Sequence, residues 1–277
     1  MLSLHPDGYR VSRGGKVLHI EKGSTEHFFH FLLGYLLPAV WLGIKSGSKI
    51  RVLDCGPLMN GRLEEALNSS GLKWEYWRGW KPWAKTVSLP RWDLSREPFE
   101  DFQNAVLFLS QALEGAPNCV ESACETKENL FLIRSPEPSF YGPAGPAILK
   151  GYGIGRREIS NREEIINHLG AVGSSFSVYQ PGAHSLRCQM KAFGSAKKVF
   201  GVRGAEWANL IWMNQETSAC VVFEGGTTTP FAPALARDLR ISLHSIVGES
   251  AAPHVDPVTV EKYFSDALPE PRWNIPN

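Results

Sequence analysis

Arg203 and the two small residues after it, Gly204 and Ala205, lie between two stretches that predict regular structure. The apolar run Lys198–Val202 is typical of a buried strand, and the pattern after the turn predicts a helix that opens near Trp207. A strand–turn–helix unit presents backbone N–H groups at the helix N-terminus, where the helix dipole stabilises an anion. Arg203 adds a forked, charge-assisted donor that suits a phosphate. The segment therefore predicts an anion site at one end of a parallel sheet.

Glu224 ends a second apolar strand, Ala219–Phe223, and is followed by Gly225 and a run of threonines that begins at Thr227. A carboxylate at a strand end can accept hydrogen bonds from ribose hydroxyls, as it does in nucleotide-binding folds. The threonine hydroxyls and N–H groups can hold a phosphate. An acid that caps the next helix is a nearly equal interpretation of Glu224.

Three further arginines can supply positive charge to the same ligand. Arg134 ends the predicted strand Leu130–Ile133, and Arg156 and Arg157 follow the glycine-rich stretch Gly151–Gly155. The sequence has no Asp-x-Asp pair, so we expect cations rather than a metal ion to stabilise a diphosphate, a task that preorganised groups perform well. A solvated basic pair before a helix is an equally good interpretation of Arg156 and Arg157.

His30, Glu206 and Asp54 are the candidates for a general base. The unperturbed pKa of an imidazole suits proton abstraction near neutral pH, which places His30 first. A lone histidine on an apolar helix is more often a packed core residue. Glu206 lies beside the anion turn, where holding a donor sugar is a second possible role, and Asp54 ends a strand, where functional residues collect in α/β sheets.

Five of the nine tryptophans fall between Trp74 and Trp92, with basic residues among them. Aromatic faces stack on sugar C–H surfaces, so Trp77 and Trp80 are candidates for binding a carbohydrate acceptor. Packing in a core or a domain interface is the default role of tryptophan, because its side chain buries a large apolar area.

Strands that alternate with helices must position these residues. This alternation predicts α/β layers with parallel sheets. A helix is expected from about His27 to Trp41, and Ser135–Gly155 is dense in proline and glycine and predicts a long connection. The strands are expected at Lys49–Asp54, Leu130–Ile133, Phe176–Tyr179, Lys198–Val202 and Ala219–Phe223.

Composition excludes several classes of protein. The 277 residues carry a formal net charge of +1, which does not favour a nucleic-acid binder. Five scattered cysteines without a CxxC pair argue against a disulfide scaffold or a structural zinc site and favour a reducing compartment. The apolar stretch Phe28–Ile44 falls short of the roughly 20 residues that span a bilayer, and no leader pattern precedes it. We therefore expect a soluble, cytoplasmic protein without a membrane span.

The segment from Val199 to Gly226, which holds both apolar strands and the turn after the first, resembles the signature of family 61 glycosyltransferases. The resemblance lies mainly in the C-terminal half of the chain. Upstream, the segment around Arg157 and Asn161 and the helix around His30 resemble two weaker family motifs, in the right order. The chain departs from the family pattern at Arg203 for histidine, Glu206 for glycine, Ala208 for threonine and Gly34 for aspartate. The matching signature residues are Gly204, Ala205, Asn209, Leu210, Met213, Val221, Val222 and Glu224.

This resemblance implies a GT-B-like fold, with two Rossmann-like lobes, parallel sheets and a cleft between the lobes. It implies an acceptor-side lobe over residues 1–134, a connection over 135–155, a donor lobe over 156–260 and a tail over 261–277 that packs back on the first lobe. The implied reaction moves a sugar, xylose or GlcNAc, from a UDP-sugar to a hydroxyl of a glycan or glycoprotein. We expect it to be inverting and metal-independent, with no tightly bound cofactor, and with donor contacts from Gly204, Ala205 and Asn209.

Two other classes of function stay open. Ile50–Gly56 resembles the first strand and loop of S-adenosylmethionine methyltransferases, which would place a cofactor at Asp54. The loop continues with Pro57, however, and lacks the glycines that allow close approach to that cofactor. A carbohydrate- or nucleotide-binding relic without catalysis is the second alternative.

Overall fold

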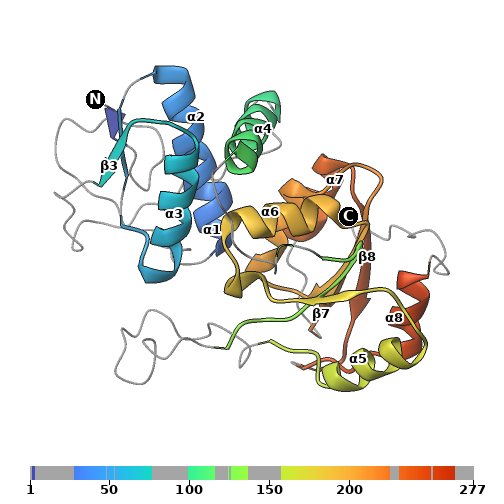
Figure 1. The fold of residues 1–277 in the computed structure, drawn as a ribbon. Helices are drawn as coiled ribbons and strands as arrows, with labels where there is room; N and C mark the ends of the chain where they lie inside the picture. Colours follow the sequence, from blue (N-terminus) through green and yellow to red (C-terminus); the bar gives the residue numbers. More distant parts are fainter. Residues whose placement is uncertain are drawn as a thin grey trace, which may run out of the picture. The chain divides into compact units, whose positions relative to one another are not determined.

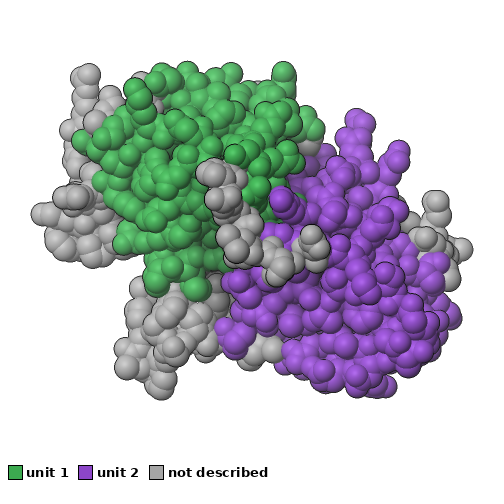
Figure 2. Space-filling model, viewed as in Figure 1, with its two compact units in different colours: residues 1–121, 185–190 green, residues 122–184, 191–277 purple. Residues whose placement is uncertain are grey.

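A computed structural model of the chain describes residues 2–3, 28–47, 49–52, 54–76, 99–115, 124, 126–136, 157–224, 231–250 and 252–265. The chain divides into two compact units, which are coloured separately in Figure 2. Unit 1 comprises Met1–Glu121 and Ser185–Met190, and unit 2 comprises Ser122–His184 and Lys191–Asn277. Each unit contains one parallel sheet, which confirms the predicted α/β class.

Unit 1 has a three-stranded parallel sheet in the order β1-β2-β3, formed by Leu2–Ser3, Ile50–Val52 and Trp74–Tyr76. Helix α3 (Pro57–Ser69) connects β2 to β3, as parallel pairing requires. Helix α4 (Phe99–Gly115) packs on α2 (Leu37–Ser46) and α3.

One continuous helical stretch, Phe28–Ser46, extends five residues beyond the expected end at Trp41. It comprises α1 (Phe28–Phe31), the π-helical turn η1 (Leu32–Leu36) and α2. Pro38 has no N–H to donate to the carbonyl four residues earlier, which offers a physical reason for the irregular turn before it. By length and composition this stretch could cross a membrane, but 61% of its apolar window is buried inside the protein, as in a core helix. This one helix does not establish a membrane span.

Unit 2 has a five-stranded parallel sheet in the order β5-β4-β6-β7-β8. Its central strand β6 (Lys198–Val202) pairs with β4 (Asn129–Leu132) and with β7 (Ser218–Phe223). The outer strands are β5 (Ser177–Tyr179) and β8 (Ser242–Val247). Because β4 pairs with β5 and β6, the expected assignment of this strand to the N-terminal lobe is wrong: a short apolar strand does not show in sequence which sheet completes its hydrogen bonds.

Helices cover both faces of the unit 2 sheet (Figure 1). On one face, α5 (Arg162–Ala171) and α8 (Pro257–Phe264) pack together over a core that includes Phe131, Phe200 and Tyr263. On the other face lie α7 (Phe231–Leu239) and the second half of α6 (Leu186–Ser195), whose first half belongs to unit 1. This double coverage explains why β6 and β7 are nearly continuous apolar runs.

The helix expected from near Trp207 is present as a 3₁₀-helix, η7 (Ala205–Trp212), which begins two residues earlier. Trp207 donates its indole N–H to the carbonyl of Val202 at 2.9 Å and ties the helix back to the strand it follows. Runs of 3₁₀-helix this long are uncommon. A short tertiary tether of this kind gives no periodic signal in sequence, so the sequence did not show which type of helix forms.

The scattered cysteines argued against a disulfide scaffold, yet Cys124 and Cys188 are disulfide-bonded in the structure. Cys55 and Cys220 are buried and lie outside any disulfide. Burial raises the pKa of the Cys220 thiol to about 12, which makes this thiol unreactive. Spacing along the chain did not reveal the disulfide, because it depends on which side chains the fold brings together.

Candidate functional site: a buried arginine–glutamate cluster

Three of the charged residues that the sequence singled out lie at the carboxyl edge of the unit 2 sheet: Arg134, Arg203 and Glu224. The chain runs from β4 to β5 on one side and then returns to β6 on the other side of β4. The connections therefore reverse between β4 and β6. In open α/β sheets, ligands bind beyond the carboxyl ends of the strands at such a switch point. Arg134 follows β4 here, and Arg203 follows β6.

Glu224, just after β7, lies between two arginines. Its Oε2 accepts a hydrogen bond from Nη2 of Arg203. Its Oε1 forms an ion pair with Nε of Arg157, 2.8 Å away, but accepts no aligned hydrogen bond from a described residue. The three side chains are 10–16% exposed, so solvent screens these charges little. Glu224 thus fixes two guanidinium groups at the sheet edge.

Arg134 has its own carboxylate partner. Its Nε donates to Oε1 of Glu206, in the first turn of η7, at 3.1 Å. The other oxygen, Oε2, lies against Gly204, where a Cβ atom would be 2.0 Å from it. Any side chain at position 204 would collide with this carboxylate. The glycine therefore allows the carboxylate to sit directly beside the turn.

Two guanidinium nitrogens in this cluster are buried without a hydrogen-bond partner among the described residues: Nη1 of Arg134 and Nε of Arg203. A buried donor without an acceptor costs about 1–3 kcal/mol, so such groups call for an explanation. The cluster holds three arginines and two glutamates, with a formal charge of +1. A bound anion would supply the missing acceptors and balance the excess charge.

Asn161 holds the segment that carries Arg157. Its side-chain amide donates to the carbonyl of Val255 at 2.8 Å, and its Oδ1 accepts from the N–H of the same residue at 3.0 Å. This double hydrogen bond joins the start of α5 to the chain that leads into α8. The sequence identified Asn161 through the family motif but assigned it no role, and in the structure it anchors the start of α5, four residues after Arg157.

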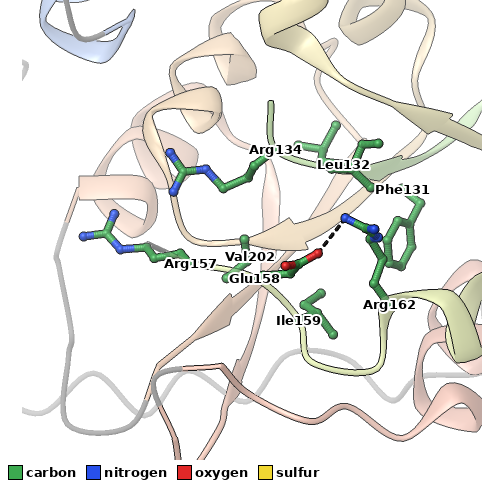
Figure 3. Close-up of a pocket in the computed structure, with 9 residues that line it drawn as sticks. Phe131, Leu132, Arg134, Arg157, Glu158, Ile159, Arg162 and Val202 are labelled. Atoms are coloured by element: carbon green, nitrogen blue, oxygen red, sulfur yellow. Dashed lines mark ion pairs between the residues drawn. The ribbon is translucent and has the colours of Figure 1, made fainter. Parts of the chain in front are cut away.

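A small pocket opens beside the cluster (Figure 3). Arg134 and Arg157 extend their guanidinium groups to the same side of it, while Arg162 turns the other way to pair with Glu158 at 2.6 Å. Its empty space is about 230 Å³, a volume that includes open solvent, so the enclosed part is well below the 300–1,000 Å³ typical of pockets that hold a whole small ligand. Its lining residues are Phe131, Leu132, Ile133, Arg134, Arg157, Glu158, Ile159, Arg162 and Val202.

Sequence reasoning missed Glu158 and Arg162 in the pocket wall. Arg162 also pairs with Glu163 at 2.8 Å. In sequence, Glu158 and Arg162 therefore look like ordinary charges at the start of a helix. Asn209, which the family motif proposed as a donor contact, is fully buried, and its Oδ1 accepts a hydrogen bond from the indole of Trp212 at 3.1 Å. Ala205 begins η7.

Two of the proposed bases lie in unit 1. His30 is half-buried in α1, with its ring 5.0 Å from that of Phe29. Asp54 is exposed, and its Oδ1 accepts from the N–H of Gly56 and from the side chain of Asn60, both at 2.8 Å. These contacts shape the turn that leads into α3, which is a local structural role for Asp54.

Five of the proposed site residues lie outside the described residues: Arg156, Gly225, Thr227, Trp77 and Trp80. Over the ranges that are described, no three His, Cys, Asp or Glu side chains gather as a metal site requires.

A family model, Glycosyltransferase 61, matches residues 28–220, more than two thirds of the chain. The similarity was expected mainly in the C-terminal half, which is wrong, since the match also covers most of unit 1. No curated protein matches the chain. Among solved structures, a mutant flavo di-iron protein from Thermotoga maritima is similar, with 14% identity and a TM-score of 0.32. The match covers 96% of this chain and 58% of that one, and so low a TM-score carries no argument.

Proposed function

The chain belongs to the glycosyltransferase 61 family, and from this premise we propose that it transfers a sugar from a UDP-sugar to a hydroxyl of a glycan or glycoprotein. The sugars that we propose are xylose or GlcNAc. We place the donor diphosphate at the carboxyl edge of the unit 2 sheet. We further propose a GT-B architecture and a reaction that requires neither a metal ion nor a bound cofactor, in a soluble, cytoplasmic protein.

The two buried donors without acceptors carry this proposal. Nη1 of Arg134 and Nε of Arg203 come from the two strands that flank the switch point. A diphosphate offers several charged oxygens, and arginine binds phosphate through forked, charge-assisted hydrogen bonds. These donors are fixed before the ligand arrives, because Glu206 and Glu224 hold the same guanidinium groups. A preorganised site of this kind stabilises developing charge without a cost of reorganisation.

The proposed reaction needs charge stabilisation where the leaving group departs. The acceptor oxygen attacks the anomeric carbon of the donor sugar, and the bond from that carbon to the diphosphate oxygen breaks. The electron pair stays on the diphosphate, and the acceptor hydroxyl loses its proton to a base. We propose Arg134 and Arg203 for the leaving diphosphate and His30 or a nearby acid for the proton. Attack from the face opposite the leaving group inverts the anomeric configuration.

The test is the substitution Arg203→Ala, measured by calorimetric titration with UDP in the presence of EDTA. A hydrogen bond to a charged group contributes about 1.5–3 kcal/mol, so we expect UDP affinity to fall by roughly 10- to 150-fold. Arg162→Ala is the matched control, because Arg162 lies in the same pocket but is engaged by Glu158 and Glu163. We expect the control to bind UDP within a few-fold of the wild type.

Unchanged UDP affinity in Arg203→Ala would remove the diphosphate from this edge of the sheet. Binding of S-adenosylmethionine without any nucleotide would favour the methyltransferase alternative. Binding of UDP without transfer or hydrolysis of any UDP-sugar would favour a relic that binds the nucleotide but has lost catalysis.

A further inference from the structure

Glu206 is an internal anion at the proposed phosphate site. Its carboxylate is bound by Nε of Arg134 and lies against the backbone of Gly204, so both its partner and its position are fixed. The side chain of Glu206 is 19% exposed and that of Arg134 is 13% exposed. Nη1 of the same guanidinium is the buried donor without a partner among the described residues. A ligand that accepts from Nη1 shares this guanidinium group with Glu206, so ordinary hydrogen-bond lengths place the two anions about 7 Å apart.

This proximity has an electrostatic consequence. Two like charges about 7 Å apart repel by an amount equal to roughly 50-fold in affinity at an effective dielectric constant of about 20. The other carboxylate in the cluster, Glu224, is already balanced by Arg157 and Arg203. Glu206 has Arg134 as its counter-charge, and the phosphate must share that arginine. Each further negative charge on the ligand therefore lowers its affinity for the site.

We propose that Glu206 is a specificity-determining residue that limits how much negative charge the site accepts. This inference rests on the proposed function, because it concerns the site assigned there to the donor diphosphate. A UDP-sugar carries about two charges. The terminal phosphate of free UDP ionises a second time with a pKa of about 6, which gives UDP about three charges at pH 8. Glu206 thus disfavours the product UDP relative to the donor and speeds product release.

The experiment compares UDP with UDP-GlcNAc at pH 8 by calorimetry, on the wild type and on Glu206→Gln. Glutamine keeps a carbonyl oxygen for Nε of Arg134 and removes the charge. We expect the variant to bind both ligands more tightly, with a gain for UDP at least about tenfold larger than the gain for UDP-GlcNAc, since UDP carries one more negative charge. Steady-state kinetics should then show stronger inhibition by UDP in the variant.

Two further variants separate this role from a structural one. Glu206→Asp keeps the charge and should keep the weak binding of UDP. Glu163→Gln makes the same change of charge in unit 2 on a side chain that is 72% exposed, and should leave both affinities within about twofold because solvent screens it. Pyrophosphate serves as a third ligand that carries no nucleoside.

The outcomes distinguish the two proposals. If UDP binds but Glu206→Gln changes UDP and UDP-GlcNAc affinity equally, or not at all, the charge-limiting role is overturned and the proposed function stands. If no nucleotide binds but pyrophosphate binds more tightly to Glu206→Gln, the charge limit is supported and the nucleotide function fails. If neither protein binds any of the three ligands, both proposals are overturned.

Discussion

Replacing Glu224 with glutamine tests how the cluster is held together. The substitution removes one charge and keeps the shape of the side chain. It leaves Arg157 and Arg203 facing a neutral amide, whose carbonyl oxygen accepts from one arginine while its NH2 group cannot accept from the other. The arginines are 16% and 11% exposed, so water replaces the lost carboxylate poorly. The variant therefore buries positive charge that is not compensated.

The expected loss follows from this burial. Removing one partner of a buried ion pair costs about 3–5 kcal/mol, and the residual exposure here places the loss near the lower figure, about 3 kcal/mol. For a unit of this size, each kcal/mol lowers the melting temperature by about 2–4 °C, so we expect a fall of about 6–12 °C for the transition of unit 2. Differential scanning calorimetry measures it, because it resolves the two units if they unfold separately.

A matched control and a rescue make the result specific. Glu75 also pairs with two cations, Lys49 and Arg51, but it lies in unit 1 and its side chain is about a third exposed. Glu75→Gln should lower the melting temperature far less, because exposed ion pairs contribute little to stability. Adding pyrophosphate should raise the melting temperature of Glu224→Gln more than that of the wild type, since the anion replaces the missing carboxylate. A fall of less than about 2 °C in Glu224→Gln would show that the Glu224 carboxylate does not compensate buried positive charge in unit 2.

Two further predictions concern packing and pH. Gly201→Ala should destabilise unit 2 by about 1–3 kcal/mol, because a Cβ there lies 2.8 Å from Cβ of Leu132. In contrast, Gly170→Ala in α5 meets no atom within 4 Å and should stabilise the helix by up to about 1 kcal/mol; denaturant unfolding of both variants checks the opposite signs. Hydrogen bonds from Lys49 and then Arg51 lower the pKa of Glu75 below its ordinary value, so the stabilisation that Glu75 provides is present above the unfolded pKa and is lost as pH falls through the folded one. The stability difference between wild type and Glu75→Gln should therefore be present at pH 7 and vanish well below about pH 4, and a difference that persists in acid would contradict this.

The parallel sheet of unit 2 and much of its site could be predicted from the sequence. Apolar runs that alternate with helical segments showed strands near β4, β6 and β7, and residues that follow the carboxyl ends of parallel strands meet at one edge. Arg134, Arg203 and Glu224 were found in this way, and the structure brings them together.

The partners of these residues could not be predicted. The sequence offered ribose hydroxyls or a helix cap as partners of Glu224, whereas the structure places its carboxylate between Arg157 and Arg203, and sequence position gives no sign of this arrangement. The pairing of Glu206 with Arg134 joins residues 72 positions apart. The 3₁₀ form of η7 and the disulfide-bonded cysteines were missed for the same reason: both depend on tertiary contacts that local patterns do not encode.

We propose that the cluster at the carboxyl edge of the unit 2 sheet binds the diphosphate of the donor. The most direct measurement is a crystal structure of the protein with UDP. We predict phosphate oxygens about 3 Å from Nη1 of Arg134 and Nε of Arg203. A well-ordered UDP whose phosphates lie elsewhere, for example beside Asp54, with both guanidinium groups still lacking acceptors, would contradict the account.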